Sequence, residues 1–490
     1  MTTIHKFDLS AAALTAMAEN GFVAVPPAEV QAEVAELTAK LPAESAESRD
    51  LRSLPWSSID NDSSLDLDQV EVAERLDNGD IRVRVGIADV DALVPIASPI
   101  DKFAALNSTS VYTGVTTFPM LPERLSTDLT SLRQDAPRPV VVIEFVVNGD
   151  GAVQSHDIYM ARVANNAKLA YRSVGEWLDG QGTLPAAATQ AIQDQLHLQD
   201  SVATKLRDNR AKAGALNLDT IEAESVVHAD QSVSIELVRK TRASDLIEDF
   251  MIAANVAIAK FLDERGSPSI RRVVKTPNRW NRIVELAAKH GEKLPEIADS
   301  LALEKFLARM RTEDPVHFAD LSLAVVKLIG PGEYALHIPG ASDSGHFGLA
   351  THDYTHSTAP NRRFADLVTQ RLVKAVLEKK PCPYSNAELE SIASHCTERE
   401  DAARKVERAV RKVTAAVSMA DHIGESYDAI VTGSNAKGVF VRLLHPPVEG
   451  RVMRNHDGMD VGERVRVKLT STDPARGFID FDGVATEGPA

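Results

Sequence analysis

The sequence of 490 residues has only two cysteines, no apolar run of membrane-spanning length and no excess of basic residues. Cys382 and Cys396 show neither metal-ligand spacing nor a disulfide pattern, so we expect buried or inert thiols in a reducing compartment. The N-terminus lacks the basic-then-apolar order of a secretory signal. These absences argue against membrane and disulfide-rich secreted proteins, and they predict a cytoplasmic location.

The net charge of −16 argues at first against a nucleic-acid partner, because phosphate binding usually leaves a basic footprint. The distribution of the charge weakens this objection. Residues 1–100 carry 7 Lys and Arg against 18 Asp and Glu, a net charge of −11, which leaves −5 for the other 390 residues. Local basic clusters lie at 269–275, 278–282, 361–363 and 404–412. A basic channel inside an acidic shell fits this pattern, and so do solvated helix faces.

Four aspartates fall within nine residues, at Asp60, Asp62, Asp66 and Asp68. Carboxylates this close raise one another's pKa, so the arrangement favours a cation among them. Short carboxylates suit Mg²⁺ or Ca²⁺, and Mg²⁺ bound by few carboxylates keeps positions open for water and phosphate oxygens. A solvated acidic loop is the simpler alternative for any run of charge.

The same segment partly fits the calcium-binding loop of an EF-hand. Suitable side chains occupy its first, third, fifth, ninth and twelfth positions: Asp60, Asp62, Ser64, Asp68 and Glu71. However, Leu65 stands where the loop requires glycine, and the flanks at 70–76 and 81–87 alternate apolar and polar residues around a turn. A strand, a turn and a strand disfavour a calcium-sensing module.

The periodicity of the chain indicates an α+β fold in three regions. Residues 1–50 contain helical patterns at 9–17 and 28–41, which predict a small helical N-terminal region. Residues 51–425 begin with hairpins and become helical beyond Asn165, which predicts one large domain with a mixed sheet and packed helices. Its expected strands are 70–76, 81–87, 138–147 and 152–163, and its expected helices are 245–264, capped by Ser244, 364–377 and 387–423.

Residues 426–490 contain five short strand patterns separated by turn residues, at 428–433, 438–444, 450–453, 463–469 and 477–481. Five strands in this length predict a small OB-fold β-barrel. OB folds commonly present aromatic and basic side chains to single-stranded nucleic acid, a role open to Phe440, Arg442, Arg451 and Arg454. A plain barrel that only packs on the main domain is the alternative.

Several segments together resemble the ribonuclease II/R (RNB) superfamily of exoribonucleases. The run Ser58-Ile-Asp-Asn-Asp-Ser-Ser-Leu-Asp-Leu-Asp68 is similar to the aspartate signature of that family, and 86–90 is similar to the strand after it. Further similar segments follow in family order, at 118–122, 125–132, 169–171, 246–255 and 354–366. The resemblance covers about residues 51–424, and it leaves no room before residue 51 for the paired cold-shock barrels of many members.

The resemblance implies helices packed around an RNA channel and a Mg²⁺-dependent 3′→5′ exoribonuclease. It would act processively on single-stranded RNA and release nucleoside 5′-monophosphates. No obligate protein partner is inferred. The implied Mg²⁺ ligands around the scissile phosphate are Asp60, Asp66, Asp68 and Gln69, and the implied catalytic residues are Asp68, Arg362 and Glu407.

The resemblance also implies how the substrate is recognised. Arg362 matches an arginine that contacts the phosphate and can stabilise charge in the transition state. Glu407 matches an acidic residue near the leaving nucleotide, and Tyr112 matches an aromatic residue that stacks on the terminal base. Tyr171 and Glu248 match residues that contact the ribose, whose 2′-hydroxyl distinguishes RNA from DNA.

This chain departs from the family pattern at Gln69, where the signature normally ends in a second adjacent aspartate. An amide oxygen can coordinate a metal, but the loss of one negative charge weakens the electrostatic attraction for Mg²⁺. Asp62 would restore the charge, since it lies on the same side as Asp60 in an extended segment. The second base-stacking ring of some members is also absent near 214–218. A non-catalytic RNA-binding protein on a decayed nuclease scaffold is therefore the alternative function.

Overall fold

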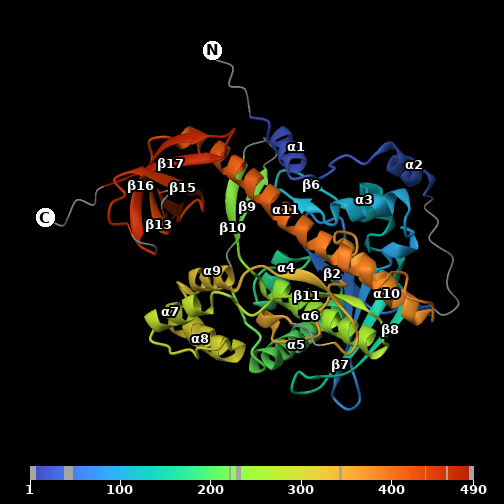
Figure 1. The fold of residues 1–490 in the computed structure, drawn as a ribbon. Helices are drawn as coiled ribbons and strands as arrows, with labels where there is room; N and C mark the ends of the chain where they lie inside the picture. Colours follow the sequence, from blue (N-terminus) through green and yellow to red (C-terminus); the bar gives the residue numbers. More distant parts are fainter. Residues whose placement is uncertain are drawn as a thin grey trace.

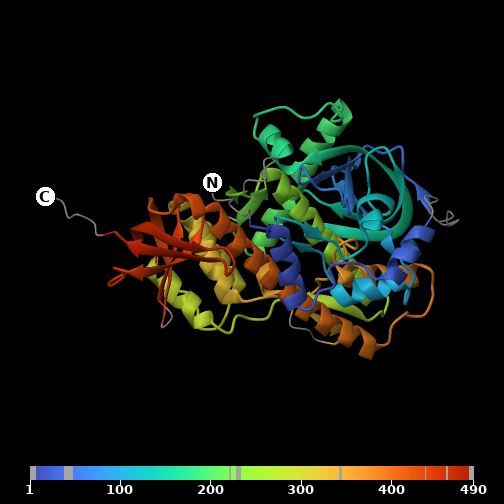
Figure 2. The same cartoon turned by 90° about the horizontal axis from the view of Figure 1, so that it is seen from above.

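The computed structural model describes residues 7–37, 48–219, 222–227, 233–341, 345–435, 438–459 and 462–484. Helices and strands form a mixed sheet with helices packed on it, together with a closed barrel near the C-terminus, which confirms the expected α+β class. Figures 1 and 2 show the barrel and the large sheet at opposite sides of the molecule. Within the described ranges, no helix combines the length and the apolar character needed to cross a bilayer.

The large sheet is built on the two expected hairpins. Its strands are β1 (Arg49–Asp50), β2 (Trp56–Asp60), β3 (Gln69–Arg75), β4 (Ile81–Ala88), β7 (Pro137–Val147) and β8 (Val153–Ala170). They are ordered β1-β8-β2-β3-β4-β7, and β7 also pairs with β8. The helical part of the domain begins at Tyr171 and not directly after Asn165 as expected, because β8 continues to Ala170 by pairing in parallel with β2. The partner strand thus overrides the local sequence periodicity there.

The helices α4 (Tyr171–Leu178), α5 (Gln190–Lys212) and α6 (Arg242–Glu264) pack on this sheet. Further helices of the domain are α3 (Pro99–Asn107), α10 (Phe364–Leu377) and α11 (Asn386–Ser418). The helix α6 packs on β7, where Phe250 meets Phe145 edge to face with ring centroids 6.4 Å apart. The bounds of α10 are those expected. By contrast, α6 begins earlier than expected because Thr241 is its N-cap and Ser244 completes a capping box, and α11 ends at Ser418 instead of 423.

A unit of three helices was not anticipated. It contains α7 (Trp280–Lys289), α8 (Ser300–Glu313) and α9 (Phe318–Ile329), which share a hydrophobic core of their own. Short strands complete the domain: β5 (Val111–Tyr112), β6 (Thr117–Phe118), β9 (Glu222–Val227), β10 (Val233–Val238), β11 (Ser269–Val273) and β12 (Glu333–His337).

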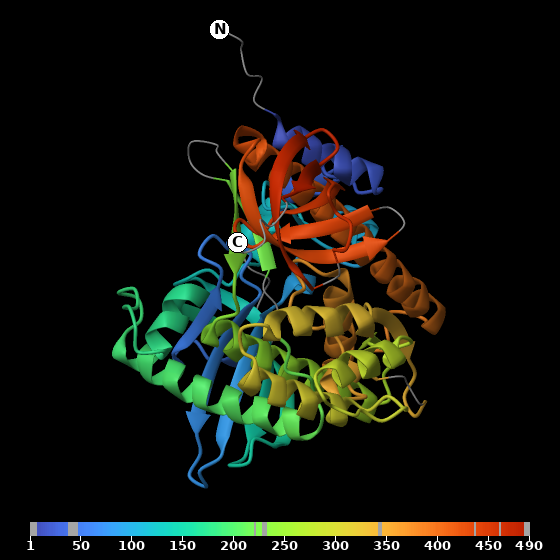
Figure 3. The same ribbon diagram turned by 90° about the vertical axis from the view of Figure 1, so that its left-hand side faces the viewer.

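The C-terminal barrel confirms the expected five strands. They are β13 (Ser426–Asn435), β14 (Gly438–Leu443), β15 (Glu449–Arg454), β16 (Arg464–Asp473) and β17 (Phe478–Gly483), closed in the order β13-β14-β15-β17-β16. The barrel follows α11 and lies above the α7–α9 unit (Figures 1 and 3). Arg442, considered above for an RNA contact, forms an ion pair of 2.6 Å with Asp320 of α9, and its role in RNA binding stays a prediction.

The N-terminal region is helical as expected. It contains α1 (Leu9–Glu19), which packs on α11, and α2 (Ala28–Glu36), which packs on α3 (Figure 1). The expected continuation of the second helix from 38 to 41 lies outside the described residues. Of the two cysteines, Cys396 is buried and Cys382 is exposed.

Candidate active site

A cavity of about 840 Å³ brings together eight of the nine side chains selected from the sequence. Those eight are Asp60, Asp66, Asp68, Gln69, Tyr112, Tyr171, Arg362 and Glu407. They come from the ends of β2 and β3, the β5–β6 hairpin, the start of α4, the loop before α10, and α11. The fold thus gathers residues separated by up to several hundred positions in the sequence around one cavity.

Asp68 is held by the loop that precedes α10. Its Oδ1 accepts a hydrogen bond from the backbone N–H of Asn361 at 2.9 Å, and its Oδ2 accepts one from Nε of Arg362 at 3.3 Å. The side chain is only 2% exposed. Burial raises the pKa of Asp68 from 3.8 to about 7, although the charge of Arg362 opposes the rise. The positive charge of Arg362 therefore does not offset the cost of burying the ionised form of this carboxyl group.

Asp60 and Gln69 meet at the adjacent ends of β2 and β3. Gln69 donates from Nε2 to Oδ1 of Asp60 at 3.3 Å. The other carboxylate oxygen, Oδ2, is buried and has no hydrogen-bond partner in the described part of the structure. Burial raises the pKa of Asp60 to about 6, again against the charge of Arg362. The site thus has a buried oxygen that a cation would satisfy.

Tyr112 connects the aspartates to α11. Its hydroxyl donates to Oδ2 of Asp66 at 3.0 Å, and its backbone N–H donates to Oε1 of Glu407 at 3.2 Å. The residue is 42% exposed and lines the cavity. An exposed ring beside the carboxylates is suitable for stacking on a base.

Tyr171 enters the cavity from another direction. It is the first residue of α4, directly after Ala170, which pairs with Asp60 across β8 and β2. This pairing places Tyr171 next to the acidic residues.

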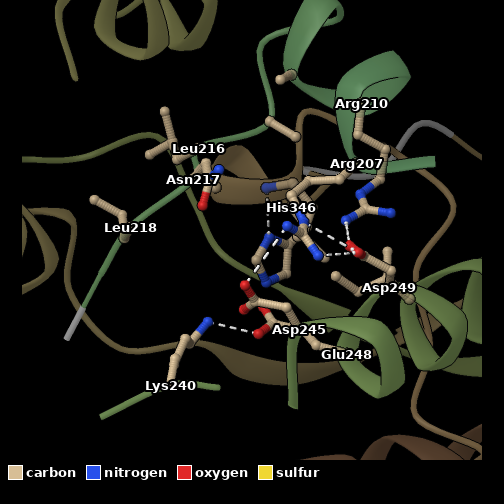
Figure 4. A pocket seen from close by; sticks show the side chains of 15 residues that line it. Arg207, Arg210, Leu216, Asn217, Leu218, Lys240, Asp245, Glu248, Asp249 and His346 are labelled. Atoms are coloured by element: carbon tan, nitrogen blue, oxygen red, sulfur yellow. Dashed lines mark hydrogen bonds and ion pairs between the residues drawn. The ribbon is translucent and has the colours of Figure 1, made fainter. Parts of the chain in front are cut away.

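Glu248 is the one selected residue that the structure does not bring to this cavity. It lines a separate pocket of about 250 Å³ between α5 and α6, where it accepts a hydrogen bond of 2.5 Å from Nζ of Lys240 (Figure 4). On the other side of that pocket, Arg207 and Arg210 both pair with Asp249. The match of Glu248 to a family residue did not reveal which face of α6 it occupies.

The position of Asp62 does not favour the charge compensation expected for it at Gln69. Its side chain is exposed and is not part of the cavity wall. A further acidic residue close to Asp60 is Glu71, which was considered above only as a calcium ligand. It lies on β3, is fully buried and has no hydrogen-bond partner for either carboxylate oxygen in the described structure. Burial raises the pKa of Glu71 well above its usual value, and Asp60 adds to the rise.

Arg411 was not selected individually, although it lies in a basic cluster noted above. It lines the cavity one helical turn after Glu407, so its spacing of four residues was the available signal. Several other arginines of the basic clusters form internal ion pairs: Arg272 pairs with Glu400, and Arg363 with Asp366. In the cavity itself, the cations are Arg362 and Arg411.

The donors fit a hard cation chemically, but they are not arranged around one point. Among the described residues, no three Asp, Glu, His or Cys side chains form a group ready to bind a metal ion. The carboxylates of Asp60, Asp66 and Asp68 and the amide of Gln69 nevertheless face one cavity, and Mg²⁺ prefers such oxygen ligands. A divalent cation would also relieve the cost of ionising the buried Asp60 and Asp68.

Comparison with known families identifies the chain. The RNB domain matches residues 48–379, and the RNase II-type exonuclease C-terminal S1 domain matches residues 425–484. The RNB match covers more than half of the sequence, so the protein belongs to the RNB family. This confirms the resemblance and the nature of the terminal barrel. The boundaries expected at 50 and 425 stay predictions.

One relative is ribonuclease R 1 of Lactococcus lactis, which is 29% identical over 467 residues, covering 88% of this chain and 55% of the relative. The chain therefore spans about half the length of this curated relative. The fold is similar to that of Mycoplasma genitalium RNase R in complex with ribose methylated single-stranded RNA, with a TM-score of 0.87, 22% identity, and 97% and 78% of the two chains covered. It is also similar to yeast Ssd1, a pseudonuclease, with a TM-score of 0.71, 16% identity, and 91% and 56% covered.

Proposed function

We propose that this protein is a Mg²⁺-dependent 3′→5′ exoribonuclease that hydrolyses single-stranded RNA processively to nucleoside 5′-monophosphates. The observation that carries the proposal is the meeting of Asp68 with Arg362 in a cavity that also contains Asp60, Asp66 and Gln69. The names of the relatives support it, since they include ribonuclease R enzymes.

The positively charged side chains of the cavity suit a phosphodiester. Arg362 has its backbone oxygen bound by the N–H of Ser110 at 2.9 Å and its Nε directed at Asp68, which fixes the guanidinium before substrate arrives. The side chain is 43% exposed, so it can also reach a phosphate oxygen and stabilise its charge in the transition state. Arg411 adds a second positive charge on the α11 side.

Asp60, Asp66, Asp68 and Gln69 would hold the metal. When bound, Mg²⁺ supplies a Lewis acid and makes water a better nucleophile. Tyr112 positions Asp66 through its hydroxyl and offers its ring to the terminal base, while Tyr171 offers a second ring near Asp60. Glu407 is near both the Tyr112 backbone and Arg411, which suits a role beside the leaving nucleotide.

A non-catalytic RNA-binding protein is the second candidate. Gln69 in place of an acid and the structural similarity to a pseudonuclease favour it. Against it, three aspartates, an arginine and Glu407 still surround one cavity, which a binding protein would not need.

Product analysis on single-stranded RNA separates these candidates. With Mg²⁺ we expect 5′-labelled RNA to be converted to a short labelled end product while unlabelled nucleoside 5′-monophosphates are released, and with EDTA we expect intact RNA. A 3′-blocked RNA is the control for direction. RNA that is bound but never shortened with Mg²⁺ would support the binding protein. The cytoplasmic location and the lack of an obligate protein partner stay predictions.

A further inference from the structure

A small hydrophobic cluster lies behind the cavity, and we name it the rear cluster. It consists of Ala13, Ala16, Met17, Phe22, Val111, Phe118, Ala403, Val406 and Val410. Its members come from α1 and the turn after it, from the β5–β6 hairpin, and from α11. The N-terminal region thus forms one of the three sides of this cluster.

On the other two sides, active-site candidates directly follow buried members of the cluster in the sequence. Val111 is fully buried, whereas the next residue, Tyr112, is 42% exposed and lines the cavity. Neighbouring residues of a strand point to opposite faces, so the cluster anchors the strand from behind. On α11, Val406 is likewise fully buried, and the next residue, Glu407, lines the cavity. The hairpin and α11 also meet in front, through the hydrogen bond from the Tyr112 N–H to Glu407.

Several contacts fix α1 and its turn in this position. Asp8 caps α1 by accepting from the N–H of Ala11 at 2.9 Å. The guanidinium of Arg399, from α11, lies 3.7 Å from the ring centroid of Phe22 and donates to the backbone oxygen of Asn20 at 3.1 Å. Asn107 then forms two hydrogen bonds with the backbone of Val23, of 3.0 and 3.1 Å. The cap stabilises α1 itself, and the contacts of Asn20, Phe22 and Val23 attach the turn after α1 to α11 and α3.

We propose that α1 is a positioning element for the terminal nucleotide of the RNA, and that Met17 and Phe22 hold Tyr112 and Glu407 in place from behind. The inference rests on the proposed RNA-binding role of the cavity. Met17 is 2% exposed and Phe22 is 5% exposed, and neither lines the cavity. They therefore act through Val111 and Val406 and do not touch the substrate.

Binding of single-stranded RNA in EDTA tests this proposal without requiring catalysis. Met17→Ala leaves a void in the rear cluster, and we expect about a tenfold weaker Kd because Tyr112 no longer sits correctly for stacking. Met17→Leu, which nearly preserves the volume, restores the Kd. Leu14→Ala is the matched control, since Leu14 lies on the same helix and is 46% exposed. Phe22→Ala replaces Met17→Ala if the latter does not fold.

A double-mutant cycle separates positioning from a merely structural role. If Met17 acts through Tyr112, then Met17→Ala weakens binding in the wild-type background but changes the Kd less than twofold in a Tyr112→Ala background. An equal loss in both backgrounds, or an unchanged Kd in folded Met17→Ala, overturns the proposal. Because the readout is binding, failure of the wild-type protein to cleave RNA contradicts only the proposed enzymatic function.

Discussion

Asp68→Asn is expected to stabilise the metal-free protein at neutral pH. Burial raises the pKa of Asp68 from 3.8 to about 7, a difference of roughly three pKa units. At 1.36 kcal/mol for each unit, ionised Asp68 costs the fold about 4 kcal/mol relative to the protonated form. Asparagine retains an acceptor for the Asn361 N–H, but its amide faces the guanidinium of Arg362. We therefore expect a net gain of about 2 kcal/mol for the variant.

The difference in stability between the variant and the wild-type protein depends on pH. Because the pKa of Asp68 is raised in the folded state, the wild-type protein loses stability as the pH rises from about 4 to about 7. The variant lacks this titration, so its advantage is absent at pH 4 and complete at pH 8. Thermal unfolding in EDTA measures it, and 2 kcal/mol corresponds to about 2–4 °C in a domain of this size.

Added Mg²⁺ provides the control. It should raise the unfolding temperature of the wild-type protein at pH 8 more than that of Asp68→Asn, since the variant has lost a ligand. A variant that is less stable than the wild type at pH 8 in EDTA, or that shows the same pH dependence, would show that the carboxyl group is not penalised by burial.

Three other substitutions test separate parts of the site. Arg362→Lys should reduce the rate of single-turnover cleavage about 100-fold with little change in RNA affinity, because a lysine cannot bind Asp68 and a phosphate in the same fixed geometry. A reduction of the cleavage rate below threefold contradicts this role. In a calorimetric titration, Gln69→Asp should lower the Mg²⁺ concentration for half-maximal binding roughly tenfold. An unchanged concentration would show that the amide of Gln69 does not weaken Mg²⁺ binding. Glu71→Gln should stabilise the metal-free protein at pH 8 by about 1–3 kcal/mol and have little effect at pH 4, because burial raises the pKa of Glu71. A variant less stable than the wild-type protein at pH 8 would contradict the destabilisation of ionised Glu71 by burial.

Local sequence patterns predicted the helices and strands that are determined by their own residues. The hairpin of β3 and β4 follows from strict alternation, and α10 follows from a helical apolar face with the expected bounds. The end of β8 could not be read in this way, because its parallel partner β2 decides it. The α7–α9 unit was missed although it has its own core.

In the candidate site, too, contacts between residues distant in the sequence could not be predicted from local patterns. Asp68 and Arg362 are 294 positions apart, and their meeting was inferred only through the family resemblance. Asp62 was considered because it could restore the charge lost at Gln69, and Glu248 because it matches a family residue, but Asp62 is exposed and Glu248 lines a different pocket. Glu71 gave little signal, since a glutamate in an alternating strand usually faces water.

Cleavage and binding of 5′-labelled single-stranded RNA, measured in parallel for the wild-type protein and Asp68→Asn with Mg²⁺, decide whether this cavity is an active site. We expect the wild-type protein to shorten the RNA stepwise from its 3′ end, and the variant to bind the RNA with similar affinity but leave it intact. Equal cleavage by the variant, or no cleavage by the wild-type protein, would contradict the assignment.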